Sequence, residues 1–230
     1  MSEAPLDRPA WHALNGRQAS YAIPAGRAVR YASDAALFAA CRDDSEASHA
    51  DLGRIIREAG AGVLLQAAAT PPLPGLNVEK QGECVQMVAA SLTSATPPRP
   101  IEPAVRLTDA DAPQMLALAT LTEPGPFFAQ THRLGEFWGV KDGDGRLLAM
   151  AGERMRLDGH TEVSGVCTHP DHRGHGHGAM LTWLVAARIL ARGETPFLHS
   201  YTANAGAVAL YEALGFRPRA LMTATFLRAV

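Results

Sequence analysis

The chain has 230 residues, of which 21 are Lys or Arg, 23 are Asp or Glu and 47% are hydrophobic. This composition is typical of a globular protein that forms one large domain or two small ones. The formal net charge of -2 lacks the basic excess that nucleic-acid or anionic-membrane partners require, so we expect neither partner.

The beginning of the chain gives no sign of a targeting segment. Residues 1–7 carry two acids and no apolar core, unlike a secretory signal or a transit peptide. Residues 59–78 are uncharged over the length of a membrane span, but prolines and glycines interrupt them, so we expect a strand and a loop. The 3 Cys form no CxxC pair, which argues against a disulfide framework or a thiolate metal site. We therefore expect a cytoplasmic protein with reduced cysteines.

The first region, residues 1–95, reads as a small α/β unit. We expect an edge strand at 28–31, one or two helices within 35–59, and strands at 63–67 and 84–92. No residue pattern in this region indicates a reaction centre.

A proline-rich segment follows at 96–103. Pro97, Pro98, Pro100 and Pro103 can continue neither a helix nor an inner strand. We interpret this segment as a linker that separates residues 1–95 from a second domain at 104–230.

The second domain alternates helices and strands, which predicts an α/β fold with a mixed sheet. Asp109 is the expected N-cap of the first helix, and Asp-Gly steps mark the turn of the hairpin that follows. The predicted elements are a helix at 110–121, strands at 137–140, 147–153 and 161–168, a helix at 178–192, a strand at 196–200, a helix at 205–214 and a strand at 221–227.

The most informative segment is a glycine-rich loop, 169–178, which lies between the strand ending at Thr168 and the helix beginning near Gly178. Glycines let the backbone approach a phosphate closely, and a helix start presents unpaired N–H groups at the positive end of its dipole. The loop therefore predicts an anion-binding site, although the glycines could also serve only a tight turn.

Other readings of this loop fit less well. A mononucleotide P-loop needs a Lys, and none follows Lys141. A dinucleotide fingerprint is formally met by Gly174, Gly176 and Ala179, with Glu194 about twenty residues later, but Glu194 precedes the next strand instead of ending it. A zinc site would use imidazoles without a carboxylate or thiolate partner; its candidates are His169, His172, His175 and His177.

Two motifs resemble the GNAT superfamily of acyl-CoA-dependent N-acetyltransferases. Residues 173–178, Arg-Gly-His-Gly-His-Gly, resemble its Arg/Gln-x-x-Gly-x-Gly/Ala pyrophosphate loop, and residues 204–216 resemble its Asn…Leu-Tyr-x-x-x-Gly-Phe helix. The resemblance covers about residues 103–230 and implies a splayed, mostly antiparallel mixed sheet flanked by helices. It also implies that residues 1–95 are a degenerate GNAT-like half, which packs against the second domain and closes the acceptor pocket.

The resemblance implies acetyl-CoA as co-substrate, an amine as acceptor and no metal. Glu162 is the expected catalytic base, with Glu153 as a substitute, and Tyr211 is the expected proton donor to the departing thiolate. Glu123, Phe127 and Phe128 are the expected acceptor-binding residues. The backbone of Val166 or Cys167 is expected to stabilise the oxyanion. The residues expected to bind acetyl-CoA are Val166, Cys167, Thr168, Arg173, Gly174, His175, Gly176, His177, Gly178, Ala179 and Asn204.

Each of these assignments has a structural alternative: a solvated strand charge for Glu162, a packed aromatic for Tyr211, and a surface loop with core phenylalanines for 123–128. Three functions remain open at this point. The first is transfer of an acetyl group from acetyl-CoA to a primary amine by direct attack in a ternary complex. The others are a non-catalytic acyl-CoA-binding regulator and an NAD-dependent oxidoreductase. The hairpin 139–151 is a candidate homodimer contact.

Overall fold

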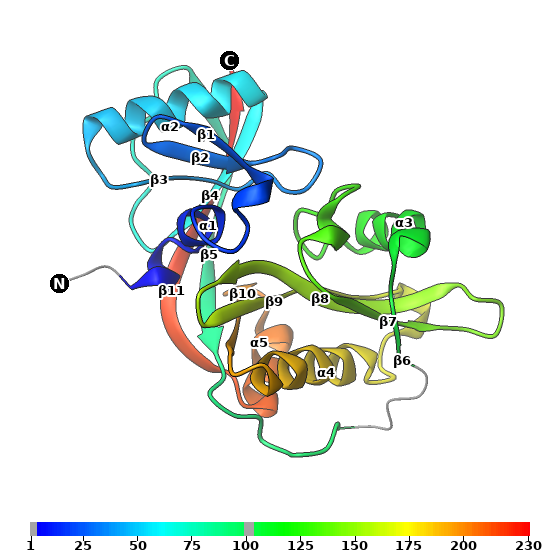
Figure 1. Ribbon diagram of the computed structural model, residues 1–230. Helices are drawn as coiled ribbons and strands as arrows, with labels where there is room; N and C mark the ends of the chain where they lie inside the picture. The colour runs from blue at the N-terminus through cyan, green and yellow to red at the C-terminus, as the bar shows by residue number, and fades with distance from the viewer. Residues whose placement is uncertain (1–3, 99–103) are drawn as a thin grey trace.

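The computed structural model describes residues 4–98 and 104–230 (Figure 1). Its helices are α1 (Pro9–Leu14), α2 (Glu46–Ala59), α3 (Ala112–Thr122), α4 (His177–Ala191) and α5 (Ala205–Leu214). Its strands are β1 (Ala22–Ala25), β2 (Ala28–Tyr31), β3 (Ala39–Cys41), β4 (Ala61–Gln66), β5 (Leu76–Val88), β6 (Ala104–Arg106), β7 (Phe137–Lys141), β8 (Leu147–Leu157), β9 (His160–Thr168), β10 (Thr195–Tyr201) and β11 (Arg217–Ala229).

One large open sheet organises the molecule. Its eight strands lie in the order β4-β11-β5-β10-β9-β8-β7-β6. Every neighbouring pair is antiparallel except β9 and β10, which run parallel. The expected mixed, mostly antiparallel sheet with flanking helices is therefore confirmed.

Helices cover both faces of this sheet (Figure 1). α4 packs against β7 to β10 on one face, whereas α1 and α3 contact β8 on the other. The side of α4 that faces the sheet carries apolar residues at helical spacing. Leu181, Val185 and Ile189 on that side are almost fully buried. The arrangement fixes the start of α4 beside the end of β9.

Strands from before and after the proline-rich segment share the large sheet. β5 lies between β10 and β11, and β4 pairs with β11 on the outside. The rest of the first region forms a small sheet, β1-β2-β3, with α2 packed against it. The predicted segment boundary at 96–103 therefore does not divide the sheet, and residues 99–103 of that segment lie outside the described residues.

The structure corrects several local predictions. Only 46–59 of the expected helical region 35–59 is helical, because residues 39–41 pair with β2 as strand β3. The expected edge strand 28–31 is the central strand of its sheet. Asp109 is not an N-cap: the side chain of Asp111 accepts a hydrogen bond from the backbone N–H of Thr108, while Asp109 pairs with Arg133.

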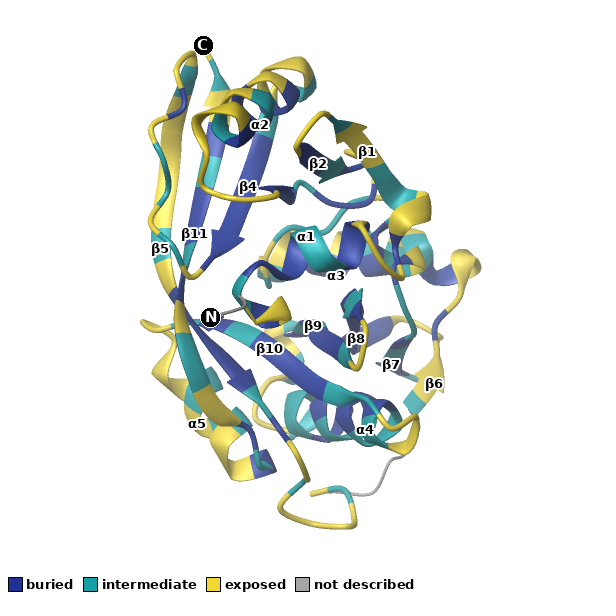
Figure 2. Ribbon diagram, turned by 60° about the vertical axis from the view of Figure 1, so that its left-hand side comes forward, coloured by how far each residue is buried: buried dark blue, intermediate teal, exposed yellow. Residues whose placement is uncertain are grey.

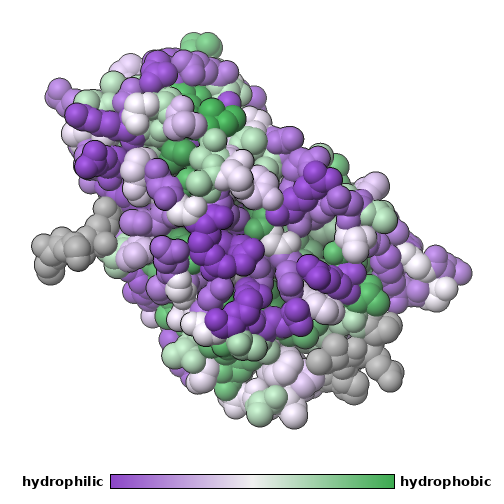
Figure 3. Space-filling view, in the orientation of Figure 1, coloured by the Kyte–Doolittle hydropathy of each residue, from purple (hydrophilic) through white to green (hydrophobic). Residues whose placement is uncertain are grey.

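Much of the surface is hydrophilic. Figure 3 shows hydrophilic side chains over much of the face viewed in Figure 1. Within residues 4–98 and 104–230, none of the helices has the length and apolar character needed to span a membrane.

Candidate active site

The parallel strands β9 and β10 pair at only three positions and then separate. The paired residues are His160 with Thr195, Thr161 with Pro196, and Glu162 with Phe197. Beyond them, β10 continues to pair with β5 and β9 with β8. The edge of β9 from Val163 to Thr168 consequently has no strand partner on its β10 side. We call this gap the wedge, and a cavity of about 520 Å³ lies in it.

A β-bulge shapes the wedge side of β9. Met150 pairs with Cys167 and Gly152 with Ser164, so β9 has one more residue than β8 between these pairs. Gly165 lies in the bulge at a φ of 63°, and a Cβ there would lie 3.0 Å from the Phe137 ring. Val166, Cys167 and Thr168 line the cavity directly after the bulge. An extended ligand can therefore reach unpaired backbone groups of β9.

The glycine loop meets the other end of this strand segment. Gly174 and Gly176 have φ values of 78° and 76°, a left-handed conformation that glycine adopts without strain. α4 begins at His177, and the first N–H groups of a helix have no intrahelical partner. A Cβ at Gly178 would point toward Thr168 Oγ1 and Val166 Cγ1, each 3.9 Å away. The helix start thus lies beside the end of β9, where its N–H groups can bind an anion.

The loop histidines have partners other than a metal. His175 Nδ1 donates to the carbonyl oxygens of His172 and Arg173, at 3.1 and 3.0 Å. The His177 ring stacks on that of His175, and His169 Nε2 accepts from Arg146 at 2.6 Å. Among residues 4–98 and 104–230, no three His, Cys, Asp or Glu side chains are grouped as metal ligands. The zinc interpretation of the loop therefore gains no support.

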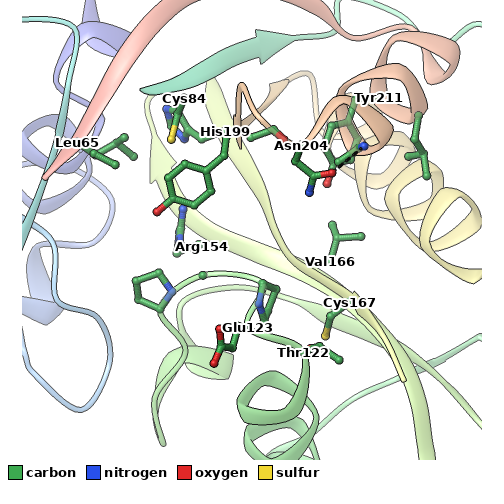
Figure 4. Close-up of a pocket in the computed structure, with 18 of the residues that line it drawn as sticks. Leu65, Cys84, Thr122, Glu123, Arg154, Val166, Cys167, His199, Asn204 and Tyr211 are labelled. Carbon is green, nitrogen blue, oxygen red and sulfur yellow. Dashed lines mark hydrogen bonds between the residues drawn. The ribbon is translucent and has the colours of Figure 1, made fainter. Parts of the chain in front are cut away.

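Tyr211 and Asn204 lie together at the α5 side of the cavity (Figure 4). Burial raises the pKa of Tyr211 to about 12, so its hydroxyl keeps its proton at neutral pH. None of the hydrogen bonds between described residues uses that hydroxyl. Asn204 caps α5 by accepting from the backbone N–H of Ala207 at 3.2 Å, as its place before the helix indicates.

Glu162 lies behind the cavity wall instead of in it. Arg154 binds its two carboxylate oxygens through Nε and Nη2 at 2.9 and 2.7 Å, and His199 Nδ1 donates to it at 2.8 Å. Burial alone would raise the pKa of Glu162, but the charge of Arg154 and these hydrogen bonds lower it to about 2. A fully buried carboxylate with this pKa is poorly suited to remove a proton from an amine.

Glu153, the substitute base, is also away from the cavity. It is 1% exposed, and its Oε1 accepts from Arg192 Nη2 at 2.6 Å. Its neighbour Arg154 is buried as well, so neither residue is a surface charge.

The cavity has two ends with different chemistry (Figure 4). The loop end comprises Val166, Thr168, Arg173, Asn204 and Tyr211. The apolar end comprises Phe38, Val63, Leu65, Cys84, Ala224 and Phe226. Residues of the first region thus form much of the apolar end.

The expected acceptor-binding residues divide between two hollows. Glu123 lines the cavity and is the one carboxylate among its described lining residues. It also lines a second hollow of about 400 Å³, where Phe127 and Phe128 lie. Phe127 packs edge-to-face on Phe137 at 5.7 Å between ring centroids, so it also belongs to the core.

Arg154 and His199 line the cavity, and the sequence reasoning did not select them. His199 is fixed between Glu162 and Gln86, whose Nε2 donates to His199 Nε2 at 3.0 Å. Glu153 and Arg156 lie on the same strand, β8, so a charged residue type alone does not single out Arg154.

The chain thus combines an open mixed sheet, a wedge between two parallel strands with a bulge beside it, and a glycine loop at a helix start. Residues 138–225 match the family model described as FR47-like protein. The chain is 42% identical to a GNAT-family protein of Novosphingobium aromaticivorans over 99% of this chain and 100% of that one, with a TM-score of 0.90. The chain therefore belongs to the GNAT family.

More distant structures share the fold. A GCN5-related N-acetyltransferase from Kribbella flavida is 22% identical over 97% of this chain and 95% of that one, with a TM-score of 0.66. A tandem GNAT protein from the clavulanic acid biosynthesis pathway is 15% identical over 74% and 63%, with a TM-score of 0.51. A search among curated proteins gave no match.

Proposed function

We propose that the protein transfers an acetyl group from acetyl-CoA to a primary amine. The observation that carries this proposal is the cavity in the wedge, which follows an unpaired strand edge as far as Arg173, directly before the glycines that lead into α4. The extended pantetheine arm can pair with β9 near Val166, and the pyrophosphate can meet the N–H groups of residues 174–179. Three further predictions rest on the sequence. They are that the transferred group is acetyl and not another acyl group, that the protein is cytoplasmic, and that it forms a homodimer contact.

The reaction we propose is direct attack in a ternary complex. The amine nitrogen forms a bond to the thioester carbonyl carbon, and the carbon–sulfur bond breaks. A backbone N–H of Val166 or Cys167 stabilises the negative charge that develops on the carbonyl oxygen. The thiolate takes a proton from the Tyr211 hydroxyl, and the proton that the attacking nitrogen loses passes through water to Tyr211 and restores that hydroxyl. The products are an amide and free CoA.

The buried position of Glu162 leads us to propose a different route for the proton of the amine. Glu123 lines the cavity, so its carboxylate can attract the protonated amine and accept its proton through water. An α-amine, with a pKa of about 8, needs less help than a lysine amine, with a pKa of about 10.4. Glu162 then acts as a positioning residue that holds Arg154 and His199.

Tyr211→Phe is expected to lower kcat by about 100-fold, because general acid catalysis contributes at least this much. Binding of acetyl-CoA and thermal stability should change little, since no described residue hydrogen-bonds to the lost hydroxyl. Steady-state kinetics with a saturating amine measure the effect. Tyr21→Phe is the matched control, because Tyr21 lies outside the cavity and donates to Arg133 O. Unchanged kcat in Tyr211→Phe would remove the proposed proton donor.

The proposed function is tested with acetyl-CoA and a panel of amines. Thiol release and acetylated amine, measured by mass spectrometry, should appear in equal amounts. Stabilisation by CoA without acetylation of any amine would indicate a non-catalytic acyl-CoA-binding protein. Stabilisation by NAD and not by CoA would indicate the oxidoreductase.

A further inference from the structure

We infer that the apolar end of the cavity is an acceptor subsite for an apolar amine that carries a neutral carbonyl group, such as an aminoacyl amide. This inference rests on the proposed function and names its substrate class. It also assigns a role to the first region of the chain, which supplies much of that end of the cavity.

The apolar end is built from short and aromatic hydrocarbon side chains on several elements. Val63 and Leu65 lie on β4, Ala224 and Phe226 lie on β11, and Phe38 precedes β3. An aliphatic side chain placed here leaves water, which favours binding in proportion to the apolar area buried. A polar or charged acceptor would gain no hydrogen bond from these walls.

The cavity adjoins the second hollow on a side that the glycine loop does not line. Glu123, Gly125, Pro126, Tyr201 and Phe226 line both the cavity and the second hollow, so the two spaces adjoin. The glycine loop lines neither the second hollow nor the apolar end. An amine can therefore enter past Glu123 while acetyl-CoA occupies the loop end, as a ternary complex requires.

Arg154 supplies a polar group next to the apolar walls. Its Nε and Nη2 are bound to Glu162, and its guanidinium stacks on Phe38 at 4.6 Å from the ring centroid. The remaining nitrogen, Nη1, makes no hydrogen bond with any residue in 4–98 or 104–230. It is therefore a donor available to a molecule in the cavity.

The charges around Arg154 Nη1 favour an acceptor group that is itself uncharged. Arg154 and Glu162 together carry no net charge, so a carboxylate bound to Nη1 would add a buried negative charge without a counter-charge. A carbonyl oxygen accepts the same hydrogen bond and adds no charge. The subsite thus distinguishes an aminoacyl amide from the corresponding amino acid.

Four acceptors separate these contributions: leucinamide, glycinamide, leucine and 3-methylbutylamine. We expect kcat/KM, calculated for the unprotonated amine, to be highest for leucinamide. Leucine and 3-methylbutylamine, which have respectively a carboxylate and no carbonyl, should each be lower by about tenfold or more. Glycinamide should be lower by about tenfold, because it lacks the apolar side chain.

Two variants on β11 locate the subsite. Ala224→Leu fills the apolar end and should bring the rate with leucinamide down to that with glycinamide. Ala220→Leu is the matched control, because Ala220 lies on the same strand but does not line the cavity.

A double variant, Arg154→Gln with Glu162→Gln, tests the hydrogen bond from Arg154. It removes Nη1 without leaving a buried charge and should abolish the preference for leucinamide over 3-methylbutylamine.

Each outcome separates this inference from the proposed function. Acetylation of all four amines at similar rates would overturn the subsite and leave the proposed function intact. A change of acyl-chain preference in Ala224→Leu, with no change of amine preference, would also overturn it, because the apolar end would then hold the acyl group. If no amine is acetylated, calorimetric binding of leucinamide to the CoA-loaded protein decides the inference: weaker binding in Ala224→Leu supports it, and no binding overturns it.

Discussion

Glu162→Gln is expected to lower the free energy of unfolding by about 3–5 kcal/mol, because it leaves the Arg154 guanidinium buried without its counter-charge. Arg154 is 8% exposed and Glu162 is 0% exposed, so water cannot replace the lost carboxylate. Chemical denaturation at neutral pH measures the change. Glu212→Gln, an exposed position on α5, is the matched control and should change the unfolding free energy by at most about 0.5 kcal/mol.

The same pair gives a pH dependence with a defined sign. Folding lowers the pKa of Glu162 from 4.5 to about 2, so the ionised carboxylate stabilises the folded state. This contribution is fully present above pH 4.5 and is lost as the pH falls toward 2. The stability difference between the native protein and Glu162→Gln should therefore narrow below about pH 4.5. A difference that stays constant from neutral pH into this range would contradict the ion pair.

These measurements also separate two roles of Glu162 in activity. If Glu162 positions Arg154 and His199, the activity of Glu162→Gln should follow the fraction of folded protein and keep the pH profile of the native enzyme. If Glu162 is the catalytic base, as the sequence predicts, the folded variant should lose activity at every pH. The low pKa and the enclosed position of Glu162 favour the first result.

Gly178→Glu is expected to weaken acetyl-CoA binding by about 100-fold while the fold is retained. An acidic residue in the first turn of a helix interacts favourably with the helix dipole, so α4 should not be destabilised. The new side chain would extend from a Cβ that contacts Thr168 and Val166 at 3.9 Å, and its carboxylate would repel the pyrophosphate. Isothermal titration calorimetry with acetyl-CoA measures the loss.

The control for this variant is Ala191→Glu, which places the same charge on the exposed last residue of α4. Its affinity for acetyl-CoA should equal that of the native protein. Equal affinity in Gly178→Glu would show that the pyrophosphate does not bind at the start of α4.

Residues 104–230 were largely predictable because their helices and strands carry local signals. Gly193 follows α4, Gly215 ends α5, and Asn204 caps α5, so the bounds of these helices follow from residues within a few positions. The glycine loop likewise predicts an anion site without knowledge of the tertiary structure. Strand lengths were harder: β11 extends over 217–229 instead of 221–227, because its partners β4 and β5 support pairing that its own residues do not specify.

The first region was less predictable because long-range contacts determine it. The alanine-rich residues 35–41 favour a helix by propensity, yet Ala39 to Cys41 pair with β2. β5 joins the large sheet through β10 and β11, which lie more than a hundred residues later in the chain. The apolar end of the cavity and the burial of Arg154 both depend on this pairing, so no local pattern identified them. Figure 2 shows the contrast within β5, whose first half is largely exposed and whose second half is largely buried.

Amide hydrogen exchange with and without acetyl-CoA tests most directly whether the wedge is the acyl-CoA site. Binding should slow exchange at residues 164–168 of β9 and residues 173–179 of the glycine loop, because the pantetheine arm and the pyrophosphate would bind their N–H groups. Exchange in α2 and in β1 to β3 should stay unchanged. Slower exchange in those elements, with no change at β9 and the loop, would contradict acyl-CoA binding in the wedge.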